Sequence, residues 1–306
     1  MAAEVYDLAI VGAGLAGLTA GLIGARYGLR IVVLDQGATG GQVLNVEKIE
    51  NFPGFPDGIA GFDLGPIVME QAEKAGAAFA MDTATGLSIN GDARVVHCAG
   101  QDITARAVIV ANGSSLRALG IPGEEQFLGK GVSHCASCDA PFFVGKEVAV
   151  IGGGDSALDE AAVLTDHAAR VLVIHRGAEF RAQQVAIDRL RERRNAEAVF
   201  NTELVQINGS DGVTSLTLRS HGATRELDIA GVFIFIGLEP NTTWLKDALD
   251  LDAAGHIVTD LHLQASVPGV FAAGDVRQSS VALLAAAAGD GATAAVSAYR
   301  YLHRGA

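Results

Sequence analysis

The 306-residue sequence is poor in cysteine and in positive charge. It contains three Cys residues, and its 22 Lys and Arg residues are outnumbered by 35 Asp and Glu residues, which gives a formal net charge of −13. Three cysteines exclude the multi-bridge framework of small secreted domains. An acidic surface repels phosphate backbones and anionic membranes, so we expect neither nucleic acid nor a membrane as a partner.

Long hydrophobic runs are absent as well. The longest, residues 232–238 and 281–289, are far shorter than a membrane span requires. The N-terminus has no basic stretch before its first apolar run, so we expect no signal peptide and a cytoplasmic protein. Glycine, in contrast, is abundant at 38 residues, which suits an α/β protein with many tight turns, and the length favours two domains.

A glycine-rich hexapeptide at residues 12–17 lies between a predicted strand at 6–11 and a helix that reaches Tyr27. A second strand is predicted at 30–34, and Asp35 follows it. The hexapeptide has the G-x-G-x-x-G pattern, whose glycines let a pyrophosphate approach the helix N-terminus, and an acid after the second strand can bind a ribose diol. The segment therefore predicts a dinucleotide-binding βαβ unit. The alternative is a purely structural turn.

The same pattern occurs a second time. A strand is predicted at Glu147–Ile151, a Gly-Gly-Gly-Asp-Ser-Ala turn at 152–157, a helix at 158–167 and a second strand at Arg170–Ile174. The order of these elements again predicts a nucleotide-binding βαβ unit.

The second unit ends in basic rather than acidic residues. His175 and Arg176 follow its last strand, and Arg181 lies five residues further on. Arginine pairs with a 2′-phosphate, which an acid would repel, so we expect NADP(H) at this unit. The alternative is that both arginines are solvated surface charges.

Between the two units lies a Cys-Ala-Ser-Cys segment formed by Cys135 and Cys138. Such a pair is redox-active, metal-binding or purely structural. A zinc site usually needs four ligands, and only Cys98 and scattered histidines remain to complete one. Two nucleotide units that bracket a dithiol instead suggest an electron path from nicotinamide through a flavin to a disulfide.

Taken together, these motifs resemble the low-molecular-weight (bacterial-type) thioredoxin reductases, which are FAD- and NAD(P)-dependent pyridine nucleotide-disulfide oxidoreductases. The matching segments follow the family's order and cover nearly the whole chain: residues 12–17, 40–42, 50–55, 135–139, 152–157, 175–176, 180–182, 235–242 and 269–275.

The resemblance implies an α/β fold of two Rossmann-like, three-layer ββα domains, one inserted in the other. Residues 1–115 and 243–306 would form the FAD domain, and residues 116–242 would form the NADP domain that carries the CxxC. Electrons would pass from NADPH through FAD and the Cys135–Cys138 pair to thioredoxin or a thioredoxin-like disulfide. The family also implies a homodimer. We expect no metal, since the ligands for a zinc site are missing.

The resemblance further assigns residues to each site. By analogy Cys138 lies nearer the flavin, Cys135 attacks the partner's disulfide, and Asp139 serves as acid and base. His134 would favour a thiolate when protonated, or else it is an exposed loop histidine without such a role. The expected FAD contacts are Gly12, Gly14, Leu15, Ala16, Gly17, Asp35, Gln36, Gly41, Gln42, Asn51, Ala111, Gly113, Gly274 and Asp275. The expected NADPH contacts are Gly154, Asp155, Ser156, Ala157, His175, Arg176 and Arg181.

Three features depart from the family pattern. Gly177 replaces a second arginine after the histidine, which would weaken NADPH binding and admits NADH, or no nicotinamide, as alternatives. Ala282 and Leu283 occupy the places of an Arg-Gln pair that meets the flavin. Asn112 stands where threonine is usual, at the first hinge.

Three other functions stay open at this point. The chain could take electrons from another donor such as ferredoxin, act as an FAD-dependent oxidase of a small-molecule dithiol, or serve as a flavin-binding redox sensor. The intact turn at 152–157 speaks against the ferredoxin route. Asp139 beside the cysteine pair speaks against a pure sensor.

Overall fold

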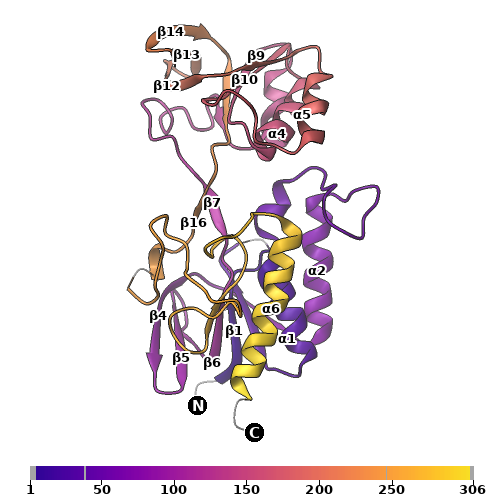
Figure 1. Cartoon of the computed structure of the whole chain (residues 1–306), viewed down its shortest axis with the longest axis vertical. Helices are drawn as coiled ribbons and strands as arrows, with labels where there is room; N and C mark the ends of the chain where they lie inside the picture. The colour runs from indigo at the N-terminus through magenta and orange to yellow at the C-terminus, as the bar shows by residue number, and fades with distance from the viewer. Residues whose placement is uncertain (1–4, 38, 246, 304–306) are drawn as a thin grey trace. The chain divides into compact units, whose positions relative to one another are not determined.

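The computed structural model describes residues 5–37, 39–245 and 247–303. The chain divides into two compact units (Figure 1): an outer unit, Met1–Ser115 with Glu239–Ala306, and an inserted unit, Leu116–Leu238. Two short strands mark the crossings, β7 (Ser114–Leu116) and β16 (Leu238–Pro240), and they pair with each other. The predicted α/β class is confirmed.

The outer unit is built on a seven-stranded sheet. Its order is β3-β2-β1-β6-β5-β4, with β17 also on β6; the pairs β6–β5 and β5–β4 are antiparallel, and all other pairs are parallel. The bounds are β1 (Val5–Val11), β2 (Ile31–Asp35), β3 (Ala78–Met81), β4 (Ala84–Asn90), β5 (Ala93–Cys98), β6 (Ile103–Val110) and β17 (Val270–Ala272).

Helices α1 (Leu15–Arg26), α2 (Gly61–Ala75) and α6 (Leu284–Leu302) lie side by side on one face of this sheet (Figure 1). A short 3₁₀ helix, η1 (Gly41–Asn45), precedes α2. In β1, Leu8 and Ile10 pack toward the helices, whereas Ala9 and Val11 pack on the opposite face. Strand side chains alternate between faces, so a strand covered on both faces is apolar throughout.

The inserted unit has a five-stranded parallel sheet in the order β11-β10-β9-β15-β8. One face packs on helices and the other on a three-stranded meander. The strand bounds are β8 (Val132–Ser133), β9 (Glu147–Ile151), β10 (Arg170–Ile174), β11 (Ala196–Val199), β15 (Gly231–Ile234), and, in the meander, β12 (Thr202–Gly209), β13 (Val213–Ser220) and β14 (Ala223–Asp228). The helices are α3 (Ala136–Asp139), η2 (Ala140–Phe143), α4 (Asp155–Thr165) and α5 (Gln184–Arg191), and η3 (Thr243–Leu245) follows the second crossing.

Two predicted boundaries were displaced. The helix expected at 158–167 begins three residues earlier, because Gly154 caps it with extended backbone and Asp155 is acidic in the first turn, where a negative charge complements the helix dipole. The strand expected at 30–34 extends to Asp35, because that residue still pairs with Met81 of the neighbouring strand.

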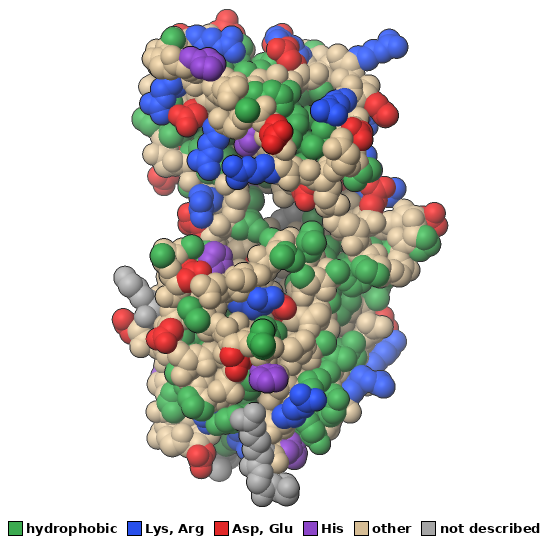
Figure 2. Space-filling view, viewed as in Figure 1, with side chains coloured by type: hydrophobic (Ala, Val, Ile, Leu, Met, Phe, Trp, Pro, Cys, Tyr) green, Lys and Arg blue, Asp and Glu red, His purple; other side chains and the backbone are tan. Residues whose placement is uncertain are grey.

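Acidic and basic side chains are intermingled over the face drawn in Figure 2, so on this face the net charge is not gathered into one patch. None of the helices in the described residues is long and apolar enough to cross a membrane. Within the same residues, no group of three or more His, Cys, Asp and Glu side chains is placed to hold a metal ion.

Two glycines of α6 provide a test of the helix packing. A Cβ atom on Gly291 would lie 2.1 Å from the Ala16 carbonyl oxygen of α1, whereas a Cβ on Gly289 meets nothing within 4 Å. We expect Gly291→Ala to lower the free energy of unfolding by about 1–3 kcal/mol through overpacking. Gly289→Ala, its control, should raise that free energy by about 0.4–1 kcal/mol by restricting the unfolded chain. Urea unfolding of both variants measures these changes, and equal effects would contradict the close packing.

Candidate functional site

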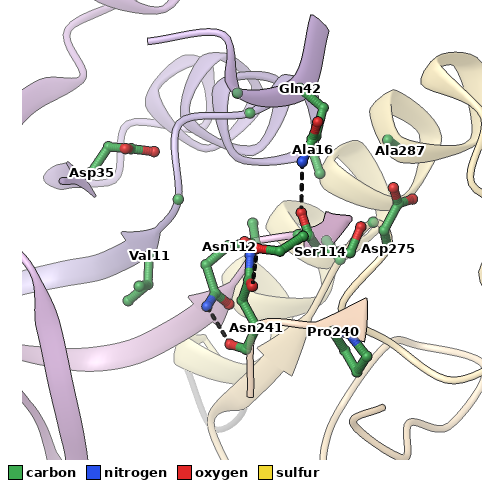
Figure 3. A pocket seen from close by; sticks show the side chains of 18 of the residues that line it. Val11, Ala16, Asp35, Gln42, Asn112, Ser114, Pro240, Asn241, Asp275 and Ala287 are labelled. Carbon is green, nitrogen blue, oxygen red and sulfur yellow. Dashed lines mark hydrogen bonds between the residues drawn. The ribbon is translucent and has the colours of Figure 1, made fainter. Parts of the chain in front are cut away.

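A cavity of about 610 Å³ opens at the carboxyl ends of the outer unit's parallel strands (Figure 3). Its wall includes the start of α1, the η1 segment, both chain crossings and the start of α6. Twelve of the residues expected to contact FAD line it: Gly12, Gly14, Leu15, Ala16, Asp35, Gln36, Gly41, Gln42, Ala111, Gly113, Gly274 and Asp275. Gly17 and Asn51 do not line it, since Gly17 is buried beneath the turn and Asn51 is exposed elsewhere.

The three glycines of the first turn have different tasks. Gly12 has a φ of 109°, and a Cβ there would lie 2.4 Å from the Ala111 carbonyl oxygen. A Cβ on Gly17 would lie 1.8 Å from the Gly12 carbonyl oxygen. Gly14 meets nothing within 4 Å and lines the cavity. Gly12 and Gly17 therefore allow the close backbone contacts of the turn, and Gly14 leaves space for a ligand.

The N-terminus of α1 faces this space. Gly14 is its N-cap without a side-chain capping bond, and its first turn contains no acidic residue. The first N–H groups of a helix have no partner within the helix and carry partial positive charge. This end of the cavity is therefore suited to a phosphate.

Asp35 ties the turn to the end of β2. Its Oδ2 accepts a hydrogen bond from the Ala13 N–H at 2.5 Å, and its Oδ1 accepts one from the Gly37 N–H at 2.9 Å. An ionised carboxylate has about four acceptor positions, so it can still bind a ribose hydroxyl. Its negative charge disfavours a phosphate on that ribose.

The two chain crossings are joined at the cavity wall (Figure 3). The Asn112 side chain donates to the Asn241 carbonyl oxygen at 2.5 Å, and the Asn241 side chain donates back to the Asn112 carbonyl oxygen at 2.9 Å. Gln42 Nε2 donates to the Ser114 carbonyl oxygen at 2.9 Å. Asn112 Oδ1 is buried and has no hydrogen-bond partner among the described residues. Since buried polar atoms are normally paired, this oxygen fits a donor on a bound ligand.

Asp275 forms another part of the wall. Burial raises the pKa of Asp275 above the usual range and the nearby Asp290 adds to this effect, whereas the hydrogen bond that the Ser280 hydroxyl donates to Oδ1 at 3.2 Å opposes it. Asp290 itself is held by Arg277 through bonds of 2.6 and 2.9 Å and by the Gly274 N–H at 3.0 Å. This ion pair fixes the loop that carries Asp275.

Several lining residues were not among the expected FAD contacts. Asp82, Thr83 and Ala84 follow β3, and Leu284 and Ala287 begin α6; further examples are Ser114, and Asn112 and the second crossing, which the resemblance placed at the hinges. The position of 82–84 directly after a strand could have indicated them, because the carboxyl ends of parallel strands meet at one edge of the sheet. The contribution of the second crossing depends on its pairing with the first, which no motif records.

The first and third glycines of the inserted unit's turn have the same surroundings as those of the first turn. A Cβ on Gly152 would lie 2.2 Å from the Phe235 carbonyl oxygen, and Gly154 meets nothing within 4 Å. Asp155 accepts hydrogen bonds from the Gln183 N–H at 2.6 Å and from Gln183 Nε2 at 3.1 Å. At Gly153, which takes the place of Ala13, a Cβ would be 2.5 Å from Nδ1 of His175.

The basic residues of this unit surround the same turn. The Arg181 N–H donates to the Gly153 carbonyl oxygen at 2.7 Å, and the side chains of Arg176 and Arg181 are exposed. His175 is half-buried, and its Nε2 has no hydrogen-bond partner among the described residues. Burial lowers the pKa of His175, and the charges of Arg181 and Arg176 lower it further. Ser156 and Ala157 lie in the first turn of α4.

Cys135 and Cys138 form a disulfide with a Cα–Cα distance of 5.4 Å. Cys138 is exposed and Cys135 is half-buried at the N-cap of α3, where its sulfur accepts a hydrogen bond from the Cys138 N–H at 3.2 Å. Asp139 is the last residue of α3. His134 Nδ1 lies 3.1 Å from the Ile234 carbonyl oxygen, so part of its ring is engaged by the backbone.

Cys98 is the third cysteine and ends β5 in the outer unit. Burial raises the pKa of its thiol to about 11, and the charges of Asp82 and Asp102 contribute to the rise. Because the thiolate is the nucleophile, this thiol is unreactive at neutral pH.

Known proteins share this architecture. A family model described as pyridine nucleotide-disulphide oxidoreductase matches residues 6–291. A thioredoxin reductase of Treponema pallidum is 42% identical over 299 residues, which is 97% of each chain. The chain belongs to this family, within its thioredoxin reductases.

Solved structures of thioredoxin reductases have the same fold as this chain. The Lactococcus lactis thioredoxin reductase in its FR conformation superposes with a TM-score of 0.95 at 36% identity and covers 98% of this chain and 99% of its own. The T. acidophilum thioredoxin reductase gives 0.92 at 32% identity, covering 96% and 98%. This thioredoxin reductase homologue is therefore an oxidoreductase with two Rossmann-like units, as the motifs predicted.

The raised pKa of Asp275 predicts how the stability of the protein changes with pH. Because its folded-state pKa is raised, the folded protein binds more protons than the unfolded chain, and stability falls as the pH rises from the usual carboxyl pKa through the raised one. Asp275→Asn should therefore make the FAD-free protein more stable than the wild type at pH 7, with a gain that shrinks toward pH 4. Urea unfolding across this range measures it.

Asp290→Asn is the contrasting variant. It removes one charge of the pair with Arg277 and should lower stability at pH 7. A loss of stability in Asp275→Asn at pH 7 would show that the carboxylate form is favoured by the fold.

Proposed function

We propose that this protein is an FAD-dependent reductase that passes electrons from NADPH through the Cys135–Cys138 pair to thioredoxin or a thioredoxin-like protein disulfide. The observation that carries the proposal is the Cys135–Cys138 disulfide in a chain with two glycine turns, each at the start of a helix and suited to a dinucleotide. The names of the relatives support the same substrate class.

The cavity of the outer unit suits FAD. The pyrophosphate would lie at Gly14 and the N-terminus of α1, and Asp35 would accept hydrogen bonds from the adenosine ribose. Asn112 Oδ1 and Asp275 would accept hydrogen bonds from other donors of the cofactor. When bound, FAD supplies a two-electron carrier between a nicotinamide and a disulfide.

The turn of the inserted unit suits NADPH. Gly154 leaves room for the pyrophosphate at the start of α4, whose first turn contains Ser156 and Ala157. Arg176 and Arg181 would pair with the 2′-phosphate through charge-assisted hydrogen bonds. The neutral form of His175 would add no charge to this site.

The Cys135–Cys138 pair would reduce the partner's disulfide by thiol–disulfide exchange. Two electrons and two protons convert Cys135–Cys138 to two thiols. The Cys138 N–H then favours a thiolate on Cys135, which attacks one sulfur of the partner's disulfide while the other sulfur leaves and takes up a proton. Cys138 attacks the mixed disulfide, re-forms the internal bond and releases the reduced partner. Asp139 would supply and remove the protons.

Exposed apolar side chains follow the cysteine pair. Phe142 is 72% exposed and Val144 is 64% exposed. They would give a protein substrate an apolar surface beside the disulfide. A cytoplasmic location and a homodimer, which the resemblance also implies, remain predictions.

Anaerobic stopped-flow tests the electron path. Mixing the FAD-loaded protein with NADPH should bleach the flavin quickly and allow reduction of thioredoxin. Arg176→Ala should weaken the response to NADPH by about tenfold or more while changing the response to NADH little. No bleaching by either nucleotide, with dithionite still reducing the flavin, would overturn the NADPH assignment and favour another donor or a dithiol oxidase.

Cys138→Ser and Asp139→Asn separate the later steps. In Cys138→Ser the flavin should still bleach with NADPH, but thioredoxin reduction should fall to background because no dithiol forms. Asp139→Asn should retain FAD and slow dithiol formation by about 10²-fold or more, as expected for loss of a general acid and base. Turnover unchanged in Asp139→Asn would remove that role.

A further inference from the structure

A serine, a histidine and an aspartate form a hydrogen-bonded row on the β4–β5 hairpin of the outer unit. Ser88 Oγ lies 2.8 Å from Nε2 of His97, and Nδ1 of the same ring lies 2.8 Å from Oδ2 of Asp102. None of these three residues lines the cavity of this unit, and the cysteine pair belongs to the inserted unit. The row is therefore separate from the cavity and from the disulfide.

The pairing of the two strands places the histidine beside the serine. His97 of β5 lies opposite Gly86 of β4, and Ser88 follows Gly86 by two residues, so all three lie on one face of the hairpin. A Cβ on Gly86 would lie 3.4 Å from Cδ2 of His97, so the ring lies over the glycine and its Nε2 reaches the serine. The glycine thus leaves space for the ring to contact the hydroxyl.

Asp102 sets the position of the proton on the ring. It directly precedes β6, and its Oδ1 accepts a hydrogen bond from the Cys98 N–H at 3.1 Å, which orients the carboxylate. The bonds from His97 and from this N–H lower the pKa of Asp102, so its ionised carboxylate only accepts hydrogen bonds. The proton of the neutral ring therefore lies on Nδ1, and Nε2 is left to accept the proton of the Ser88 hydroxyl. A serine is activated as a nucleophile by this order of contacts.

The row is open to small molecules. The side chains of His97 and Asp102 are 43% and 51% exposed, and Ser88 is half-buried. Among the described strands β4 is the last of its sheet, and such an edge presents unpaired backbone N–H groups. Because N–H directions alternate along a strand, either Ser88 or Ile89 directs its N–H to that edge, where it would stabilise an oxyanion. An open site of this kind would recognise an ester through its reactive carbonyl rather than through its shape.

We propose that Ser88, His97 and Asp102 form a separate active site that hydrolyses small activated carboxylic esters. Ser88 Oγ forms a bond to the carbonyl carbon while its proton passes to Nε2 of His97. The bond from that carbon to the alcohol oxygen then breaks, and the alcohol leaves with the proton. Water next gives a proton to Nε2 and adds its oxygen to the acyl carbon, and Ser88 leaves with this proton. One alcohol and one carboxylic acid are formed, and no group is oxidised or reduced.

Hydrolysis of 4-nitrophenyl acetate by the FAD-loaded, oxidised protein tests the proposal. In this form the cysteine pair is a disulfide, and the raised pKa of Cys98 keeps its thiol protonated, so the thiols do not compete for the ester. The variants are Ser88→Ala and His97→Ala. His262→Ala is the control, because it removes an exposed imidazole outside the row. Mass spectrometry after brief mixing locates the acetyl group.

We expect Ser88→Ala and His97→Ala each to lower kcat/KM for the ester by about tenfold or more, through loss of the nucleophile or of the general base. His262→Ala should leave kcat/KM unchanged, and the wild type should carry the acetyl group on Ser88. Asp102 is a positioning residue, since it acts through the ring. Asp102→Asn should lower kcat with little change in KM, and Asp102→Glu, which keeps a carboxylate, should restore part of kcat.

Equal rates in the wild type and Ser88→Ala would overturn the inference, and so would an acetyl group found only on lysines. A loss in His262→Ala equal to that in His97→Ala would also overturn it, since any exposed imidazole would then explain the rate. FAD content and the melting temperature establish that each variant is folded. Should His97→Ala prove unstable, His97→Gln keeps a hydrogen-bonding side chain without a base and must lower kcat/KM as strongly for the inference to stand.

Discussion

The outer unit depends on the contact between the backbone of its glycine turn and the ends of the neighbouring strands. The Gly12 N–H donates to the Leu34 carbonyl oxygen and the Ala111 N–H donates to the Val11 carbonyl oxygen, both at 2.7 Å. The turn is thereby held between β2 and β6, with no room for a side chain at Gly12. Because the turn is fixed, the first N–H groups of α1 face the cavity.

The glycine turn of the inserted unit is held by the same kind of backbone bond, but a different residue type follows its second strand. The Gly152 N–H donates to the Ile174 carbonyl oxygen at 3.1 Å, as Gly12 does in the outer unit. After the second strand, Asp35 reaches back to the Ala13 N–H, whereas His175 places its ring against Gly153. One unit thus presents a carboxylate at the end of its second strand, and the other presents a histidine ring followed by exposed arginines. Under the proposed function, this difference at the strand end would favour different nucleotides at the two turns.

Sequence patterns predicted the features that depend on residues close together in the chain. The strand–turn–helix order, the glycine positions and the disulfide-forming pair follow from residues near each other in the chain. The cavity wall at Asn112 and Asn241 does not, because it requires two segments 129 residues apart to exchange hydrogen bonds.

The proposed function requires a chain with a net charge of −13 to bind anionic cofactors, and these local arrangements would make that possible. At the first turn, α1 has neither an acidic first turn nor a side-chain cap, so its N–H groups are available to a phosphate. At the second turn, Asp155 lies at the start of α4, but both of its oxygens accept hydrogen bonds from Gln183. Its charge is thus partly offset where a phosphate would approach. Because Coulomb interactions are screened over about 10 Å at 0.1 M salt, these nearby N–H groups and arginines outweigh the distant acidic surface.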